Sequence, residues 1–405
     1  MHRRDILKGV TALGCSLAAH PLTTTMTFAS VPGDARFVVI VLRGGMDGLG
    51  VLHPMNDPNL ARMRPVLLRE SAGDPLTDGF ALHSALDPLR TLWAAGELAF
   101  APAVSTPYRG QRSHFDGQDM LEAGTGMDVA PDALRGGWLN RMLSGLPGAE
   151  SETAFAIGHE VPLILTGQNA ISSWSPETRL DLTPQARLLL EHIYAGDPVF
   201  HAAASNAIDL AESLGVSTQI DSLGEQQMMM GEALEDTRSA AGPAKLAEFA
   251  ANRLREETRI ASFSLTGWDT HRNQLGGLRT ALDRLGQAIL TLRDGLGPVW
   301  EKTTVLAMTE FGRTVAENGN RGTDHGTGGT MLMAGGALRG GQLYGTWPGV
   351  AEVDLLERRD LQPTDDVRRF AAWALRGSFG FDRAFLEQTV FPGVDLGEDP
   401  NLLRV

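Results

Sequence analysis

Hydrophobic residues in this chain form two kinds of run, and the two kinds alternate along the sequence. Mainly apolar runs, which predict strands buried on both faces, cover residues 37–42, 98–104, 260–265, 304–308 and 330–334, and the first of them is uninterrupted. Apolar residues at helical spacing, which predict amphipathic helices, lie along residues 244–259, 275–296 and 365–375. Strands that alternate with helices predict an α/β fold built on a mostly parallel, doubly wound sheet. Residues 150–245 are less regular, and we interpret them as a cap or insertion on that sheet.

Polar, glycine-rich loops follow several of these predicted strands. The stretch 303–336 places Glu310, Arg313, Asp324 and His325 between two apolar runs. The first predicted strand also ends in a glycine-rich turn, which carries Asp47. Open α/β sheets build their binding sites at the carboxyl ends of their strands. We therefore expect the functional site of this protein among these loops.

Asp269 and His271 are the strongest candidate metal ligands. They stand two residues apart at the end of a predicted strand, so in an extended backbone both side chains face the same way. His325, in another of these loops, is a third candidate, and two imidazoles with one carboxylate suit a single Zn, Mn or Fe ion. The alternative is a structural loop in which Asp269 orients His271 by a hydrogen bond.

Asp324 and His325 are neighbours, so their side chains diverge in an extended loop and we assign only His325 as a ligand. Asp324 would then orient a neighbouring imidazole, or would be a solvated turn residue. Arg313 is suited to hold an anionic group of a substrate. Alternatively, Arg313 and Glu310 form an ion pair with no further role.

Ser113 and His114 lie at the predicted start of a helix, where backbone N–H groups favour an anion or an ionised hydroxyl. This position makes Ser113 a candidate nucleophile and His114 a candidate site residue, although serine is also the usual helix cap. His53 and His83 are interpreted as structural residues.

Charge and targeting narrow the range of partners. The formal charge of −14 over 405 residues argues against nucleic acid as a partner. Arg3 and Arg4, followed by a short apolar stretch, predict a twin-arginine signal peptide over residues 1–30. That stretch is too short to span a bilayer, so we expect a periplasmic or extracellular protein without a transmembrane segment in its mature form. The only cysteine, Cys15, lies inside the signal, which excludes disulfides from the mature chain.

A family resemblance adds to this interpretation. The segments RRDILKG, VVIVLRGGMDGL, RSHFDGQDMLEAG, TGWDTH, MTEFGRT and GTDHGTGG occur in this order. Together they resemble the exported bacterial family known as domain of unknown function 1501, over nearly the whole mature chain. That family in turn resembles a remote branch of the alkaline phosphatase and sulfatase superfamily.

The superfamily resemblance implies a single three-layer αβα domain over residues 31–405 and metal-dependent hydrolysis of phosphate or sulfate esters. It implies metal ligands at Asp269, His271 and His325, and a nucleophile near Ser113. The adjacent aspartate and histidine of the superfamily's second metal site are replaced here by Glu310 and Phe311, and Arg43 stands where an acidic residue is expected. The resemblance therefore implies one divalent ion rather than two.

We expect a metal-dependent hydrolase that acts on a small anionic ester, with Ser113, His114 and Arg313 as its catalytic and substrate-positioning residues. The alternative is a non-catalytic member of the fold that binds a ligand or a protein partner in the envelope. A redox role for the same ligands is a third hypothesis, because they would also hold iron.

Overall fold

The computed structural model describes residues 33–71, 73–110, 112–127, 136–157, 162–174 and 242–404. The chain divides into two compact units, and the described residues belong to the larger one, Ser30–Pro176 together with Gly231–Val405. The smaller unit, Met1–Ala29 with Glu177–Met230, lies outside the described residues. The predicted signal peptide and most of the predicted cap therefore lie outside them as well.

The described strands form a nine-stranded sheet and a two-stranded sheet. In chain order they are β1 (Arg36–Arg43), β2 (Leu52–Pro54), β3 (Phe80–Leu82), β4 (Leu98–Ser105), β5 (Ala154–Ile157), β6 (Ser172–Trp174), β7 (Ile260–Thr266), β8 (Thr303–Thr309), β9 (Gly329–Ala334), β10 (Gln342–Leu343) and β11 (Asp365–Asp366). All five predicted strands are present, and each starts or ends within one residue of the expected range.

The large sheet has the order β10-β4-β9-β8-β1-β7-β5-β6, with β11 also paired to β4. Strand β1 is parallel to β8 and β7, with Val38 aligned to Val305 and to Ala261. Strand β9 is antiparallel to both of its neighbours, β8 and β4. The sheet is therefore mostly parallel, as expected, and β9 is its antiparallel strand among the described residues.

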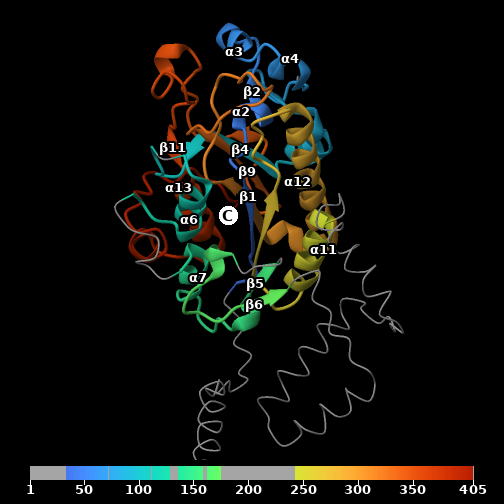
Figure 1. Ribbon diagram of the computed structural model, residues 1–405. Helices are drawn as coiled ribbons and strands as arrows, with labels where there is room; N and C mark the ends of the chain where they lie inside the picture. The colour runs from blue at the N-terminus through green and yellow to red at the C-terminus, as the bar shows by residue number, and fades with distance from the viewer. Residues whose placement is uncertain are drawn as a thin grey trace, which may run out of the picture. The chain divides into compact units, whose positions relative to one another are not determined.

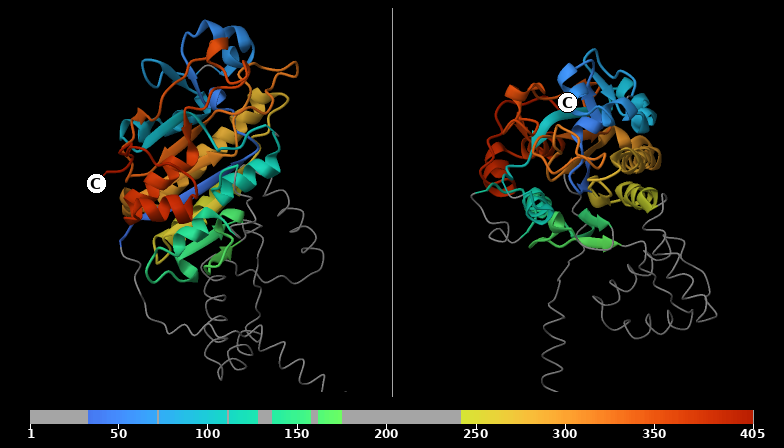
Figure 2. Two further views of the ribbon diagram at one scale, coloured as in Figure 1. Left: turned by 90° about the vertical axis from the view of Figure 1, so that its left-hand side faces the viewer. Right: turned by 45° about the horizontal axis from the view of Figure 1, so that its top comes forward.

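Helices lie on both faces of this sheet (Figures 1 and 2), with α11 and α12 on one side and α6, α7 and α13 on the other. The α-helices are α2 (Gly48–Val51), α3 (Pro58–Met63), α4 (Leu67–Ser71), α5 (Arg90–Ala94), α6 (His114–Ala123), α7 (Trp138–Leu143), α11 (Gly242–Leu254), α12 (Gln274–Leu296), α13 (Val367–Phe379) and α14 (Arg383–Phe385). Short 3₁₀ and π turns are η1 (Ser84–Leu89), η3 (Ser151–Thr153), η4 (Leu163–Leu165), η5 (Gly297–Lys302), η6 (Glu352–Asp354) and η7 (Leu386–Val390).

The two helical layers explain why β1 is apolar without interruption. Phe37, Val39 and Val41 belong to the core cluster that includes residues of α7 and α13. Alternate side chains of a strand point to opposite faces, so Val38 and Ile40, which are also fully buried, face the other layer. On that layer, α12 buries its apolar stripe of Leu278, Leu282, Leu285, Ile289 and Leu292.

Helix α6 begins where its sequence signals place it. Ser113 has an extended backbone, and its hydroxyl accepts a hydrogen bond from the N–H of Asp116 at 3.4 Å. Gly124 ends the helix in the left-handed conformation that glycine adopts most easily. The C-terminal helix, in contrast, begins at Val367 rather than at the expected Asp365, because the side chain of Asp366 caps it.

The prediction of a cap over residues 150–245 is wrong for residues 154–157 and 172–174. Strand β5 is parallel to β7, and β6 is parallel to β5, so residues 154–157 and 172–174 extend the main sheet. Their apolar character is explained by this position, since Ala154–Ile157 is buried along its whole length. Residues 175–241, most of the rest of the predicted cap, lie outside the described residues.

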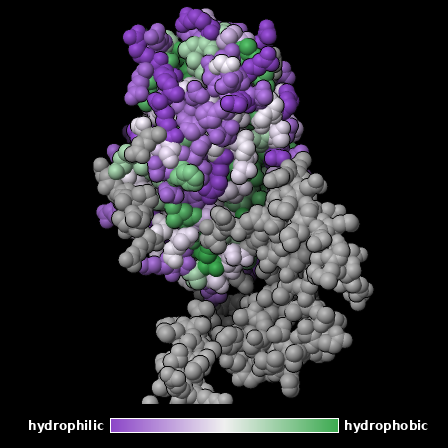
Figure 3. Space-filling model, viewed as in Figure 1, coloured by the Kyte–Doolittle hydropathy of each residue, from purple (hydrophilic) through white to green (hydrophobic). Residues whose placement is uncertain are grey.

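The face shown in Figure 3 is mainly hydrophilic over the upper part of the described residues. Among the described residues, none of the helices has the length and apolar character that crossing a membrane requires.

Two buried histidines beside the small sheet predict a pH-dependent stability. His53 and His83 are 4% and 2% exposed, and burial, with a smaller contribution from nearby arginines, lowers the pKa of each to about 4. The unfolded chain therefore binds more protons between pH 6.5 and 4, so stability is complete above pH 6.5 and is lost as the pH falls through this window. Each histidine should contribute a loss of about 3 kcal/mol.

Urea unfolding at several pH values tests this expectation. The His53→Gln variant, which is neutral throughout, should lose stability less steeply below pH 6.5 than the wild-type protein. An identical pH dependence in the two proteins would contradict the neutral, buried state of His53.

Candidate metal centre

The predicted site loops meet because their strands are neighbours. Strands β8, β1 and β7 lie side by side and run in the same direction, so the loops that follow them emerge at one edge of the sheet. These loops carry Glu310 and Arg313 after β8, Gly44 after β1, and Asp269 after β7. The amino end of the antiparallel β9 lies at the same edge and brings His325 there. Strand β4 ends there too, and α6 follows it in the chain.

Three imidazoles converge on one carboxylate oxygen in this region. The Nε2 atoms of His271, His325 and His114 lie 3.0, 3.4 and 3.5 Å from Oδ1 of Asp269. Within the described residues, His114, Asp269 and His325 form a group whose ligand atoms all lie within 4.8 Å of one another. His271 belongs to the same cluster, because its Nε2 is 2.9 Å from Nε2 of His325.

The other ring nitrogen of each histidine lies next to a group that can only accept a hydrogen bond. The Nδ1 atoms of His114, His271 and His325 are 2.8, 3.1 and 2.7 Å from Glu310 Oε1, Asp324 Oδ1 and the carbonyl oxygen of Arg112. Each Nδ1 is therefore assigned as a donor, which leaves Nε2 of a neutral ring with a lone pair.

These lone pairs face one another and a carboxylate oxygen at short distances. Two unprotonated nitrogens 2.9 Å apart repel each other, and a proton or a cation at the cluster relieves this repulsion. Nη1 of Arg313, 3.5 Å from Nε2 of His271, is a charged donor that is present there, and a metal ion would be a second cation. Nε2 of His114 is buried and has no hydrogen-bond partner. Imidazole nitrogens and a carboxylate oxygen are ligands that Zn, Mn and Fe accept, so this donor set fits the expected ion.

Glu310 is the most buried member of the cluster and lies behind His114. Its side chain is 0% exposed, and Oε1 accepts hydrogen bonds from His114, from the side chain of Gln118 and from the N–H of Gly44. Burial by itself raises the pKa of Glu310, but these hydrogen bonds outweigh it, so the pKa lies below its ordinary value. In turn, the hydrogen bond to Glu310 raises the pKa of His114. Glu310 therefore pairs with His114 and not with Arg313.

Arg313 lies beneath the cluster, and its position corrects the expectation that it holds a substrate anion. Its side chain is 0% exposed and donates to the carbonyl oxygens of Gly44, Gly45, Trp268 and Thr323, and to Oδ1 of Asp269. These contacts occupy the guanidinium group and join three loops. Asp269 is desolvated, yet its pKa is lowered, chiefly by the hydrogen bond from Arg313.

The two glycines after β1 make this arrangement possible. Gly44 and Gly45 both have positive φ angles, which glycine tolerates and other residues rarely adopt. A Cβ atom on Gly44 would lie 2.6 Å from the backbone nitrogen of Asp269, and one on Gly45 would lie 2.7 Å from the ring of Phe311. Side chains at these positions would push apart the loops that Arg313 joins.

The remaining predicted residues differ in whether they contact the cluster. Asp324 contacts His271, as expected of an orienting carboxylate, and is itself 54% exposed. Asp47 is buried at 1% exposure and binds Arg64 through both oxygens, so its carboxylate does not face the cluster. Ser113 caps α6, and this role explains its presence without catalysis.

Sequence reasoning gave no role in the centre to two residues that shape it. Phe311 is 3% exposed and packs against the rings of His114 and His325, with centroids 5.0 Å away in each case. It thus fills the space next to the cluster with an apolar ring. Gln274, the first residue of α12, contacts both ligand-bearing loops. Neither has a signal in a single sequence, because Phe311 resembles any core aromatic and Gln274 any helical glutamine.

Comparison with known proteins identifies the family. Residues 78–387 match the family described as "Protein of unknown function (DUF1501)", and the chain belongs to that family. No curated protein matches the chain. Among solved structures, the chain is similar to the lipoteichoic acid synthase LtaP from Listeria monocytogenes, with 8% sequence identity and a TM-score of 0.40. That similarity covers 92% of this chain and 76% of the other.

Proposed function

We propose that this protein is a metal-dependent hydrolase of anionic esters, phosphate or sulfate, with a single divalent ion at its centre. The observation that carries the proposal is the convergence of three imidazole Nε2 atoms on Asp269 Oδ1, with every Nδ1 beside an acceptor. Asp269, His271 and His325 would hold the ion, and His114 offers a further nitrogen. Zn, Mn and Fe are the candidate metals.

A bound divalent ion would act as a Lewis acid, which neutralises charge that develops on the ester and lowers the pKa of water. The protein groups would hold the ligands in one protonation state. Glu310 and Asp324 accept hydrogen bonds from the Nδ1–H groups of His114 and His271, which keeps the proton of each neutral ring on Nδ1 and leaves Nε2 without one. Arg313 compensates part of the Asp269 charge, which weakens the attraction of this carboxylate for a cation.

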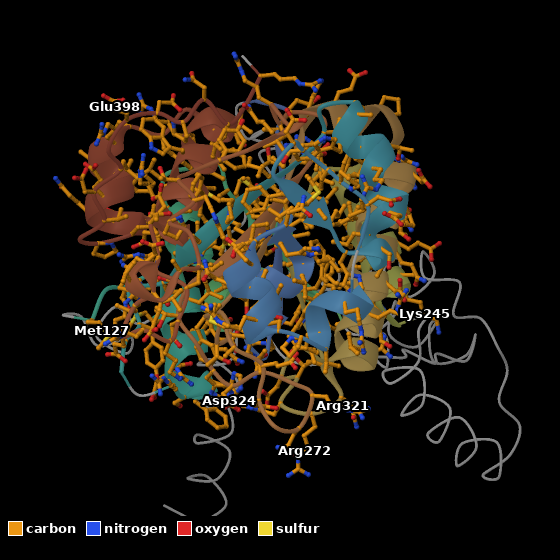
Figure 4. All side chains as sticks on the ribbon, turned by 90° about the horizontal axis from the view of Figure 1, so that it is seen from above. Met127, Lys245, Arg272, Arg321, Asp324 and Glu398 are labelled. Atoms are coloured by element: carbon orange, nitrogen blue, oxygen red, sulfur yellow. The ribbon has the colours of Figure 1, made fainter. Side chains whose placement is uncertain are left out.

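An anionic substrate is supported by two exposed arginines on the ligand-bearing loops. Arg272 and Arg321 are exposed and come from the two loops that carry the ligands (Figure 4). They contrast with the overall charge of −14, and they would attract an anion toward the cluster. The twin-arginine pattern supports a periplasmic or extracellular location for this activity.

The test is elemental analysis and an ester screen on the same purified protein. We expect about one equivalent of Zn, Mn or Fe, and we expect a His271→Ala, His325→Ala variant to lose it. Metal-loaded wild-type protein should hydrolyse at least one phosphate monoester, phosphate diester or sulfate ester, and the variant should not. A metal-loaded protein with no activity across these classes would refute the hydrolase proposal.

The same assay distinguishes the two candidate roles of Ser113, nucleophile and helix cap. If Ser113 is the nucleophile, Ser113→Ala should lower kcat by about 10⁴ to 10⁶-fold. If it only caps α6, the variant should keep its kcat and lose about 1 kcal/mol of stability.

A second candidate function is a non-catalytic protein of the envelope that binds a ligand or partner. It is favoured by the burial of Arg313, because this group, which the hydrolase hypothesis assigned to the substrate, is engaged within the protein. One stoichiometric protein partner captured from periplasm, retained by the His271→Ala variant, would support this candidate.

A further inference from the structure

One buried side-chain amide joins the two loops that carry the metal ligands. Oε1 of Gln274 accepts hydrogen bonds from the hydroxyls of Thr270 at 3.1 Å and Thr323 at 2.6 Å. Thr270 stands between Asp269 and His271, and Thr323 precedes Asp324 and His325 in the chain. A single oxygen atom therefore bridges the loop after β7 and the loop before β9.

The orientation of this amide is fixed from its other side. Nε2 of Gln274 donates to Oδ2 of Asp47, a carboxylate that can only accept. Arg64 holds the same carboxylate through two nitrogens, at 2.6 and 3.0 Å, and also donates to the carbonyl oxygens of Thr314 and Val315. Gln274, Asp47 and Arg64 are 2%, 1% and 2% exposed, so water does not compete for these contacts.

The backbone joins the same loops independently of this side chain. The N–H of Thr323 donates to the carbonyl oxygen of Thr270 at 3.2 Å, and the N–H of Gln274 donates to that of Arg321 at 2.9 Å. The loops thus stay connected when the amide is removed, and what the amide adds is their spacing. That spacing is sensitive, because Nε2 of His271 and Nε2 of His325 are only 2.9 Å apart.

We infer that Gln274, oriented by Asp47 and Arg64, is a positioning residue of the metal centre. It sets the distance between the ligands of the two loops without contacting the ion. This inference rests on the metal site of the proposed function. It also gives a role to Asp47, whose carboxylate is buried and does not face the cluster. Groups that orient metal ligands typically change metal affinity by about 10 to 100-fold when they are removed.

The experiment uses Co²⁺ as a probe, because its visible absorption reports the number and arrangement of its ligands. Gln274→Met keeps the length of the side chain and removes all three hydrogen bonds. Thr323→Val is nearly isosteric and removes one, so it decides the question if Gln274→Met does not fold. Metal affinity is measured by competition with a chelator, and stability of the metal-free protein by urea unfolding.

Asn140 provides the matched control. It is a buried amide, 1% exposed, and it hydrogen-bonds to Leu165 and Asn169 rather than to the ligand-bearing loops. Asn140→Leu should lower stability and leave the Co²⁺ spectrum and affinity as in the wild-type protein. Gln274→Met should weaken Co²⁺ binding by about 10 to 100-fold and change the spectrum. Thr323→Val should produce a smaller change in the same direction.

The outcomes separate this inference from the proposed function. Wild-type spectra and affinities in both Gln274→Met and Thr323→Val would overturn the positioning role. A wild-type protein that binds no Co²⁺ would overturn the metal centre together with the role of Gln274. A wild-type protein that binds Co²⁺ but hydrolyses no ester would refute the hydrolase alone, and the response of the Gln274 variant would still decide the inference.

Discussion

Replacing His114 with alanine is expected to weaken binding of a divalent metal ion by more than 100-fold. The substitution removes an imidazole ring whose Nε2 is buried, has no hydrogen-bond partner and lies 3.5 Å from Asp269 Oδ1. Loss of a direct ligand should exceed the roughly 10 to 100-fold effect of losing a group that only orients one. Zn²⁺ titration of the metal-free protein in competition with a chelator measures the difference.

Glu310→Gln provides the graded comparison for this prediction. The amide keeps the size of Glu310 but replaces an ionised acceptor of the Nδ1 proton with a neutral one, so its effect should fall within about 10 to 100-fold. His53→Gln, a histidine outside the cluster, should leave affinity unchanged. Wild-type affinity in His114→Ala would show that Asp269, His271 and His325 suffice to bind the ion and that His114 is not a further ligand.

The affinity should also fall as the medium becomes acidic. The hydrogen bond that His114 donates to Glu310 raises the pKa of His114 above its ordinary value, so the Nε2 lone pair is lost to a proton at a higher pH than in a free imidazole. Metal binding should therefore weaken as the pH falls through that raised pKa. The dependence should become shallower in His114→Ala, which has no such group to titrate.

Replacing Arg313 with methionine is expected to destabilise the whole larger unit by about 3 to 5 kcal/mol. The guanidinium group donates to four backbone carbonyl oxygens of three loops, and its removal leaves those carbonyls without their buried partner. The contribution of the Asp269 carboxylate should be smaller, because that residue is 47% exposed and solvent screens its charge. The free energy of unfolding in urea, with metal-free protein, measures the effect.

Arg313→Lys and Asp269→Asn divide this effect into its parts. Lysine keeps the charge but lacks the planar set of donors, so it should restore only a small part of the lost stability. Asp269→Asn removes the ion pair alone and should cost much less than Arg313→Met. If Arg313→Met raised KM for an ester and left the unfolding free energy unchanged, the original expectation of a substrate-binding arginine would be correct after all.

Several features followed from the sequence because they depend on residues close together in the chain. The mainly apolar runs of β1, β7 and β8 predicted central strands, since strands covered by helices on both faces have no polar side to show. Ser113, Asp116 and Gly124 determined where α6 begins and ends. The spacing of Asp269 and His271 placed both side chains toward one point. Because parallel strands end at the same edge, the loops after these strands were expected to carry the site.

Only the tertiary structure decided the partners of the charged residues. Arg313 was expected to face a substrate or to pair with Glu310, but it lies under three loops because Gly44 and Gly45 turn their carbonyl oxygens toward it. Glu310 binds His114, which is 196 positions away in the chain. Likewise, β9 is antiparallel, and an apolar run carries no information about direction. Local sequence determines which residues are buried, whereas pairings between distant loops depend on how the chain closes.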